Sequence, residues 1–216
     1  MKRDKIKGER MKTCYIIAGG EFDGFFDQIN EEDMVIAADK GYIHAREAGI
    51  TPTMIIGDFD SSNQPEGDLV IKLNPIKDYT DTKAALMVAE DWGYKNIVIY
   101  GGLGGRDSHT LANISNALEF KKKGINVTLK SKNKSFYIVD DELSYDFKDE
   151  NDFYVSIFAL SEIVKGVDIK GLYYELNNYD LTYDNALGVS NETVKRDFKI
   201  SVASGYLLVI FEDKSI

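Results

Sequence analysis

The chain has 216 residues, 44% of them hydrophobic, and a formal net charge of −10 at pH 7. Its length and apolar content suffice for a sizeable core in one large domain or two small ones. The acidic balance argues against a nucleic-acid-binding surface, which is normally basic. No apolar run is long enough to span a membrane, and residues 1–10 lack the apolar stretch of a secretory signal. We therefore expect a cytoplasmic protein, and Cys14, the single cysteine, fits a reducing compartment.

The first half of the chain alternates short apolar runs with helical stretches, which is the pattern of βαβ units. Helices are predicted around residues 42–48, from Asp81 or Thr82 to Trp92-Gly93, and from about residue 110 to residue 123. An open, mostly parallel α/β domain is expected over residues 11–131, after a loose extension of residues 1–10; the family resemblance described below implies that this domain binds a nucleotide. Its predicted strands are residues 14–18, 34–38, 53–56, 69–73, 97–100 and 125–129.

The pattern changes after a polar junction at residues 131–134. Beyond it the chain is rich in β-branched and aromatic residues, with short alternating runs and many Gly, Asn and Asp turns. This pattern predicts an antiparallel β-sandwich over residues 132–216. Its predicted strands are residues 153–158, 162–169, 171–176, 193–202 and 206–211.

Two acids, Asp58 and Asp60, follow the apolar strand Met54-Ile55-Ile56, immediately after Gly57. Open α/β sheets bind their ligands at the carboxyl ends of such strands. Mg²⁺ favours one or two carboxylates together with phosphate oxygens, so the pair could hold this ion. The same residue types also form turns that cap helices, and that alternative stays open for this stretch alone.

A glycine-rich loop, Gly101-Gly102-Leu103-Gly104-Gly105, follows the strand at residues 97–100 and precedes a helix. Such a loop lets main-chain N–H groups approach a phosphate, and Arg106 adds donors that suit phosphate oxygens. The spacing matches neither a Walker A loop nor a dinucleotide-binding loop. His109, which follows Arg106, fits a phosphate contact or a packing role equally well, whereas His44, within a predicted helix, is interpreted as structural.

Taken together, residues 57–61, 77–83 and 101–113 resemble the three signature blocks of the thiamine pyrophosphokinase family. The stretch Ala38-Asp39-Lys40-Gly41 resembles the family's Ala-Asp-Gly-Gly segment, with Lys40 in place of glycine. The likeness continues in residues 171–176, 188–192 and 204–210, so it spans nearly the whole chain from Thr13 onward.

The resemblance implies transfer of a pyrophosphoryl group from ATP to the hydroxyl of thiamine, with Mg²⁺ as the cofactor and a homodimer as the assembly. It places Mg²⁺ at Asp58, Asp60 and Asp81, and a further catalytic acid at Asp39. It places ATP or phosphate contacts at Lys77, Thr82, Lys83, Gly102, Gly104, Gly105, Arg106, Ser108 and His109.

One position departs from the family pattern Gly-Gly-Arg-x-Asp-His. Ser108 stands where the acid is expected, and Asp107 comes one residue earlier. Either Ser108 takes over the role by hydrogen bonding, or Asp107 reaches the same place.

The resemblance also implies a thiamine site in the second half of the chain. Tyr174 occupies an aromatic position suited to stacking on the cationic ring, and Ser190 and Asn191 match a polar pair of the thiamine-binding loop. Without the resemblance, these residues fit an ordinary sheet surface and turn. Another Mg²⁺-dependent enzyme of nucleotides or phosphate esters, or a non-catalytic nucleotide or cation sensor, would also account for the acidic and glycine blocks.

Overall fold

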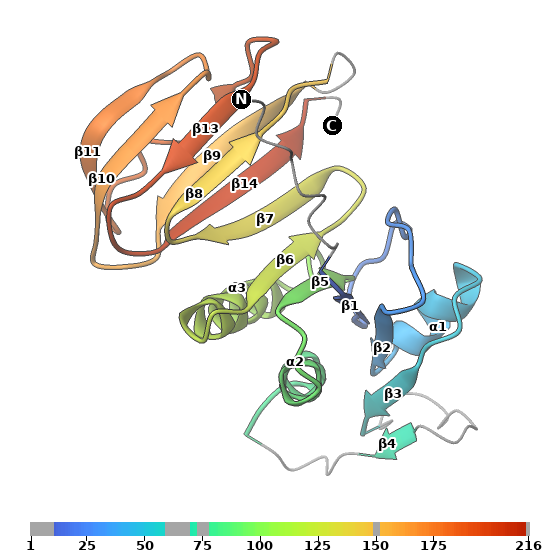
Figure 1. The fold of residues 1–216 in the computed structure, drawn as a ribbon. Helices are drawn as coiled ribbons and strands as arrows, with labels where there is room; N and C mark the ends of the chain where they lie inside the picture. The colour runs from blue at the N-terminus through green and yellow to red at the C-terminus, as the bar shows by residue number, and fades with distance from the viewer. Residues whose placement is uncertain (1–10, 59–69, 73–77, 149–151, 215–216) are drawn as a thin grey trace, which may run out of the picture.

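The computed structural model describes residues 11–58, 70–72, 78–148 and 152–214. Its strands form two sheets, a ten-stranded mixed sheet and a four-stranded antiparallel sheet (Figure 1). The strand order is β12-β9-β14-β7-β6-β5-β1-β2-β3-β4 in the large sheet and β11-β10-β13-β8 in the small one. No helix among the described residues is both long enough and apolar enough to cross a membrane.

One half of the large sheet is parallel. Its strands are β1 (Thr13–Ile17), β2 (Met34–Ala38), β3 (Met54–Gly57), β4 (Val70–Lys72), β5 (Asn96–Tyr100) and β6 (Asn126–Lys130). The helices that accompany them are α1 (Gly41–Glu47), α2 (Asp81–Asp91) and α3 (Asp107–Lys122).

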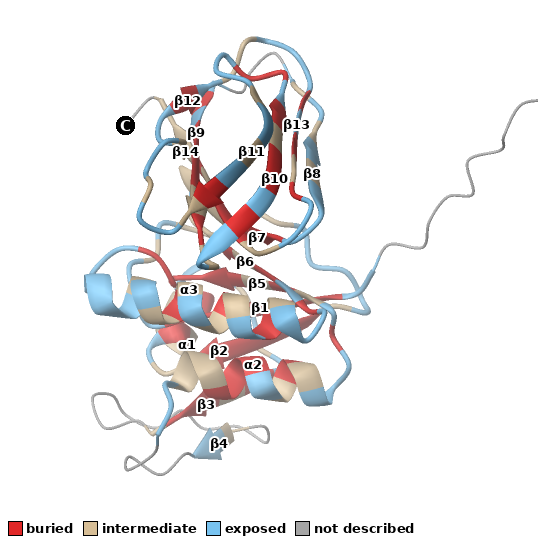
Figure 2. Ribbon diagram, turned by 90° about the vertical axis from the view of Figure 1, so that its left-hand side faces the viewer, coloured by how far each residue is buried: buried red, intermediate tan, exposed pale blue. Residues whose placement is uncertain are grey.

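Helices cover both faces of this parallel half, which explains its continuous apolar strands. Along β1, Cys14 and Ile16 belong to the cluster that includes the buried side of α2 and α3, whereas Tyr15 and Ile17 pack with Ala45 of α1. Figure 2 shows α2 and α3 lying side by side on one face of the sheet. Because successive side chains of a strand point to opposite faces, a strand between two helical layers must be apolar at every position.

The other half of the large sheet is antiparallel and joins the parallel half where β7 pairs with β6. Its strands are β7 (Lys134–Val139), β9 (Phe153–Ala159), β12 (Asn191–Glu192) and β14 (Leu207–Asp213). The small sheet contains β8 (Glu142–Tyr145), β10 (Ile163–Lys170), β11 (Leu176–Thr182) and β13 (Phe198–Ser201).

The central strand of the antiparallel half, β14, also alternates between two cores. Leu207, Val209 and Phe211 join a cluster with Val164 and other residues of the small sheet. Leu208 instead belongs to the cluster that contains the buried side of α3. An apolar core therefore lies between the two sheets, and α3 covers the opposite face of the large one.

The predicted change from a parallel α/β region to antiparallel strands is confirmed. Three details of the prediction are wrong. Residues 171–175 contain bends and one isolated bridge at Leu172 rather than a strand, and β11 begins only at Leu176. Residues 193–202 contain only β13 as a strand, and α3 begins at Asp107 rather than near residue 110. The division at residue 131 stays a prediction, since the strands on either side of it are neighbours in one sheet.

Candidate functional site

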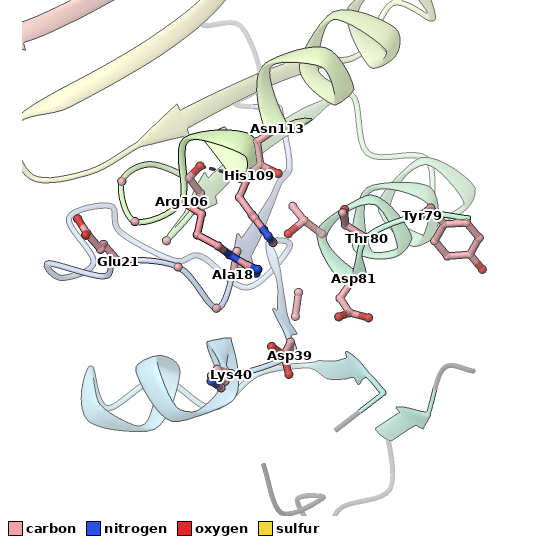
Figure 3. A pocket seen from close by; sticks show the side chains of 18 of the residues that line it. Ala18, Glu21, Asp39, Lys40, Tyr79, Thr80, Asp81, Arg106, His109 and Asn113 are labelled. Atoms are coloured by element: carbon pink, nitrogen blue, oxygen red, sulfur yellow. Dashed lines mark hydrogen bonds between the residues drawn. The ribbon is translucent and has the colours of Figure 1, made fainter. Parts of the chain in front are cut away.

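The topology of the large sheet places a cavity at the carboxyl ends of its parallel strands. β1 lies between β2 and β5. From β1 the sheet extends in one direction through β2 and β3 to β4, and in the other direction through β5 to β6. Ligands of open α/β sheets bind at such a switch point. Here a cavity of about 850 Å³ occupies that place (Figure 3). Its lining includes residues that follow β1, β2, β3 and β5, and residues at the starts of α2 and α3.

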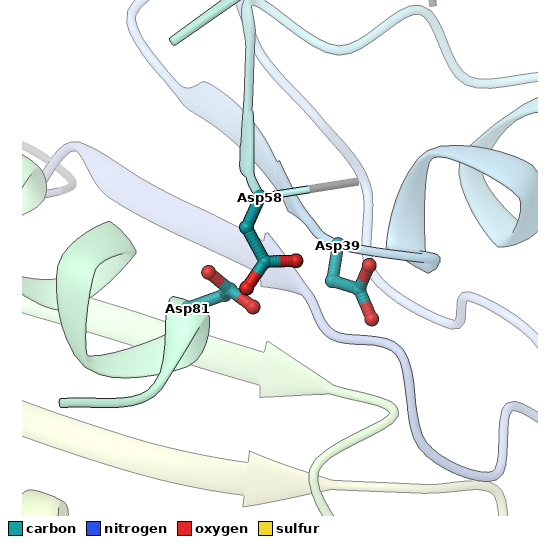
Figure 4. Close-up of side chains that lie close together, drawn as sticks. All are labelled: Asp39, Asp58 and Asp81. Carbon is teal, nitrogen blue, oxygen red and sulfur yellow. The ribbon is translucent and has the colours of Figure 1, made fainter. Parts of the chain in front are cut away.

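Three carboxylates converge in this cavity (Figure 4). Asp39 follows β2, Asp58 follows β3, and Asp81 is the first residue of α2. One oxygen atom of each carboxylate lies within 4.8 Å of the others, and all three residues are half-buried. Like charges at this separation repel one another, and a cation bound among them would relieve the repulsion.

Asp39 is the most constrained of the three carboxylates. Its backbone is left-handed, with φ of 50°, and its N–H donates to the carbonyl oxygen of Ile56 at 2.8 Å, which ties the end of β2 to β3. Its Oδ1 atom is buried and has no hydrogen-bond partner among the described residues. Burial raises the pKa of Asp39, and the nearby carboxylates of Asp81 and Asp58 raise it further. An all-oxygen donor set with an unsatisfied buried oxygen fits a hard divalent cation such as Mg²⁺.

The glycine loop faces the carboxylates from the other side of the cavity. Gly101, Gly104 and Gly105 have positive φ angles of 67°, 78° and 66°, a conformation that suits glycine. The loop is fixed by Asn113, a buried residue of α3 whose Nδ2 donates to the carbonyl oxygen of Gly102 at 2.8 Å. Asn113 was not predicted as a site residue, since an amide within a helix gives no signal in the sequence.

Most of the predicted phosphate contacts reach the cavity. Figure 3 shows Arg106 and His109 directed into it from the start of α3. Of the residues predicted from the sequence, those that line the cavity are Asp39, Asp58, Asp81, Thr82, Gly102, Gly104, Gly105, Arg106 and His109.

Other predicted residues are not brought to the cavity. The ammonium of Lys83 forms an ion pair with Glu119 of α3. Asp107 and Ser108 are exposed in the first turn of α3, and neither is among the described residues that line the cavity. The role of the family acid at this position therefore stays open between the two. Asp60 and Lys77, the remaining two residues predicted for the Mg²⁺ and ATP site, lie outside the described residues.

The cap of α2 differs from the prediction. Thr80, rather than Asp81 or Thr82, caps the helix, and its side-chain oxygen accepts a hydrogen bond from the N–H of Lys83 at 3.2 Å. The prediction was wrong because Thr80, Asp81 and Thr82 are all good capping residues in sequence. Capping by Thr80 leaves the Asp81 carboxylate to join the acidic cluster.

Two charged residues that were not predicted as site residues also line the cavity, namely Glu21 and Lys40. The Glu21 side chain lies against the glycine loop, so closely that a Cβ atom on Gly104 would come within 2.3 Å of its Oε2. No spacing in the sequence indicates that the segment after β1 folds over the loop after β5.

Hydrogen bonds hold the segment after β1 in place. The N–H of Gly20 donates to the carbonyl oxygen of Gly101 at 3.0 Å, and Asp27 accepts from Tyr100 and from Lys130 at 2.7 and 2.6 Å. The ring of His44 stacks on Phe22, and its Nε2 lies 3.1 Å from the carbonyl oxygen of Gly20. These contacts fit the structural role predicted for His44.

The residues predicted to bind thiamine lie in the second half of the chain and do not line the cavity. The amide of Asn191 is buried and holds the backbone of Tyr174, accepting from its N–H at 2.9 Å and donating to its carbonyl oxygen at 2.7 Å. Tyr174 is 64% exposed, and its ring lies edge-on to that of Tyr173. Ser190 has a positive φ of 56°, and its N–H donates to the hydroxyl of Ser156.

Comparison with known proteins gives matches over most of the chain. The family model of the thiamin pyrophosphokinase catalytic domain matches residues 25–129, and that of the thiamin pyrophosphokinase vitamin B1 binding domain matches residues 144–207. The thiamine pyrophosphokinase of Bacillus subtilis is 34% identical over 218 residues, which cover 93% of this chain and 98% of the relative. Thiamin pyrophosphokinase 1 of Caenorhabditis elegans is 28% identical over 74% of this chain and 70% of its own.

Solved structures agree with these matches. The crystal structure of the Bacillus subtilis thiamine pyrophosphokinase superposes with a TM-score of 0.84 at 31% identity, covering 94% of this chain and all of that one (100%). The crystal structure of the thiamin pyrophosphokinase from Geobacillus thermodenitrificans has a TM-score of 0.81 at 25% identity, over 94% of this chain and 98% of that one.

The fold and the site define an α/β protein with an acidic, glycine-lined ligand site at the switch point of its sheet. Such sites suit phosphate-bearing ligands. Both family models and the relatives agree on a narrower assignment. The chain belongs to the thiamin pyrophosphokinase family, as the sequence resemblance predicted.

Proposed function

We propose that this protein transfers a pyrophosphoryl group from ATP to the hydroxyl of thiamine, giving thiamine diphosphate and AMP. One observation carries the proposal: the carboxylates of Asp39, Asp58 and Asp81 converge beside a glycine loop in the part of the chain that matches the catalytic-domain model. A separate part matches the vitamin B1 binding model, so the chain provides for both substrates.

Attack by an alcohol on a β-phosphorus depends on positioning and on stabilisation of charge more than on a covalent nucleophile. The main-chain N–H groups of the glycine loop and the guanidinium of Arg106 bind phosphate oxygens from one side of the cavity. Asp39, Asp58 and Asp81 would hold Mg²⁺ on the other side, with Asp60 as the further ligand that the resemblance implies. When bound there, Mg²⁺ supplies neutralisation of the polyphosphate charge.

The thiamine subsite is proposed at Tyr174, Ser190 and Asn191. Tyr174 is exposed, so its aromatic ring can stack on the thiazolium cation. The buried amide of Asn191 hydrogen-bonds both the N–H and the carbonyl oxygen of Tyr174. We therefore propose that Asn191 mainly positions this tyrosine. Ser190, whose left-handed backbone orients its exposed hydroxyl, supplies a polar contact.

We further propose the arrangement implied by the resemblance for the chain as a whole. Residues 11–131 form the ATP- and Mg²⁺-binding domain, residues 132–216 form a β-sandwich that binds thiamine, and two copies assemble as a homodimer in the cytoplasm. The apolar core between the small sheet and the antiparallel half of the large sheet supports the sandwich.

Incubation with ATP, Mg²⁺ and thiamine, with AMP measured over time, tests the reaction. Thiamine-dependent release of AMP is expected. Release of ADP or phosphate without thiamine would indicate a different Mg²⁺-dependent enzyme, and tight nucleotide binding without turnover would indicate a sensor.

Single substitutions test the carboxylate cluster in the same assay. Asp58→Asn and Asp81→Asn should each lower kcat by roughly 100-fold or more, because each removes a charge from the proposed metal site. Asp91→Asn, at the exposed end of the same α2 helix, is the matched control and should leave turnover unchanged. Near-normal activity of both cluster variants at limiting Mg²⁺ would contradict the assignment.

A further inference from the structure

Lys40 is a charged residue of the cavity wall that the reaction described above does not use. It stands between Asp39 of the carboxylate cluster and Gly41, the first residue of α1. Its side chain is exposed, lines the cavity, and forms no ion pair or hydrogen bond with any described residue. Figure 3 shows it beside Asp39, across the cavity from Arg106.

The backbone at Lys40 is held firmly, although its ammonium is free to move. A Cβ atom on Gly41 would lie 1.8 Å from the carbonyl oxygen of Ile17, so α1 starts in close contact with the end of β1. The Cβ atom of Lys40 itself lies 3.2 Å from the position that a Cβ on Gly19 would take. The lysine stem therefore leaves from a fixed point at the rim of the cavity, next to the acidic cluster.

Other lysines near this part of the fold are already engaged. Lys83 pairs with Glu119, and Lys130 pairs with Asp27 at 2.6 Å. Among the described residues that line the cavity, Lys40 and Arg106 are the two side chains with a permanent positive charge. They approach from opposite sides, Lys40 from the start of α1 and Arg106 from the start of α3.

We propose that Lys40 contacts the β- and γ-phosphoryl oxygens of ATP, the part of the nucleotide that is transferred. This inference rests on the proposed function. Lys40 directly follows Asp39 and lines the same cavity, so its flexible side chain can reach a polyphosphate segment that faces the carboxylate cluster. A lysine ammonium is a compact charge with three donors on a flexible stem, which suits an oxygen-rich group that moves during transfer. Together with Arg106 it would hold the polyphosphate from both sides.

A different role for Lys40 makes the opposite prediction. If its charge only offsets repulsion among the carboxylates, removing it should strengthen the attraction of the cluster for Mg²⁺ and leave phosphate affinity unchanged. If it contacts the transferred group, removing it should weaken binding of ligands that contain the pyrophosphoryl unit and spare ligands that lack it.

The test compares Lys40→Met, Lys40→Arg and the wild type by calorimetric titration with pyrophosphate and with AMP, both in the presence of Mg²⁺. Lys40→Met should weaken pyrophosphate binding about tenfold, the effect of losing one charge-assisted hydrogen bond, and change AMP binding by less than about twofold. Lys40→Arg should retain most of the affinity because it retains the charge. Lys95→Met, which removes an exposed lysine outside the cavity lining, is the matched control and should change neither affinity.

Two results would overturn the role of Lys40. One is unchanged pyrophosphate affinity in Lys40→Met, with or without a lower Mg²⁺ requirement, and the other is an equal loss for AMP and pyrophosphate. The wild type separates this inference from the proposed function. A wild-type protein that binds neither ligand and releases no thiamine-dependent AMP contradicts the proposed function, whereas an active wild type with an unaffected Lys40→Met variant contradicts only the role of Lys40.

Discussion

Asp39 has a half-buried carboxylate, and we expect its charge to destabilise the folded chain in the absence of a cation. Its carboxylate is half-buried beside Asp58 and Asp81, its Oδ1 lacks a hydrogen-bond partner among the described residues, and its backbone is left-handed. Such strain is typical of sites where binding matters more than stability. The charges of the cluster therefore lower the free energy of unfolding and increase the affinity for a cation.

A substitution at Asp39 should reveal this effect of the charge on stability and on cation binding. Asp39→Asn removes one charge and keeps a residue that tolerates the left-handed conformation. We expect it to raise the free energy of unfolding by about 0.5–2 kcal/mol in metal-free buffer while lowering kcat. Thermal unfolding with EDTA and with Mg²⁺ measures the effect, and the increase in Tm that Mg²⁺ gives the wild type should shrink in the variant. A lower Tm than wild type in EDTA would contradict the argument, and Asp91→Asn serves as the control.

Cys14 is a buried thiol at the centre of the parallel sheet. It is 0% exposed, and burial raises the pKa of its thiol far above the usual range, because the thiolate would lose its hydration. We expect it to react with a thiol reagent such as Ellman's reagent at pH 8 only as fast as the protein unfolds. Full labelling in guanidinium chloride is the control. Rapid labelling of the native protein would show that β1 opens locally.

At the scale of single elements, the cap of α2 links stability to the site. Thr80 accepts a hydrogen bond from the N–H of Lys83, and this cap fixes the first turn in which Asp81 lies. Thr80→Ala should lower the free energy of unfolding by about 1 kcal/mol, as expected for loss of an N-cap. Thr80→Ser, which retains the hydroxyl, should lose much less. Urea unfolding measures both variants, and equal stability of Thr80→Ala and wild type would show that the cap contributes nothing.

Strands that are buried on both faces could be predicted well from the sequence. The strand predicted at residues 34–38 is the observed β2, because every residue of Met34–Ala38 is buried and apolar. The prediction of a strand over residues 171–176 was wrong, because it was based on the aromatic content of this segment. Gly171, with φ of 90°, begins a bend there, and Tyr173 and Tyr174 are exposed rather than packed in a sheet.

The site was predictable where it follows strands and helix starts. Asp39, Asp58 and Arg106 come directly after or before regular elements, so the topology of a parallel sheet brings them together. Glu21 could not be predicted, because its place depends on how the loop after β1 folds over Gly104. The engagement of Lys83 by Glu119 depends on the packing of α2 against α3, which the sequence does not specify.

At the scale of the whole molecule, one group of exposed apolar side chains falls within residues 173–189, the stretch that contains Tyr174 and ends just before Ser190. Among the described residues there, those with large exposed fractions are Tyr173, Tyr174, Tyr183, Leu187 and Val189, with 65%, 64%, 71%, 51% and 48% exposed. Contiguous exposed apolar residues are typical of interfaces or ligand sites. Tyr174 of the proposed thiamine subsite is one of the five, and none of them lines the cavity proposed for ATP, as expected if a second copy of the chain completes the site.

Tyr174→Ala tests the thiamine subsite. Loss of a desolvated cation–π contact corresponds to roughly 1–2 kcal/mol, so the KM for thiamine should rise by about five- to thirty-fold. Nucleotide binding should change little because Tyr174 does not line the cavity proposed for ATP. An unchanged thiamine KM would remove this tyrosine from the site.

Mixing two impaired variants, with activity measured at a thiamine concentration below the wild-type KM, tests whether the site is shared between chains. An Asp58→Asn chain has a damaged carboxylate cluster and an intact Tyr174, whereas a Tyr174→Ala chain has the reverse. In a homodimer whose site combines the cavity of one chain with the tyrosine of its partner, one of the two sites in a mixed dimer is intact and the other carries both defects. Denaturing and refolding the two variants together should then restore up to about a quarter of the wild-type activity, because random pairing makes half of the dimers mixed. If each site lies within one chain, no mixed dimer contains an intact site, and activity should stay at the average of the two separate variants.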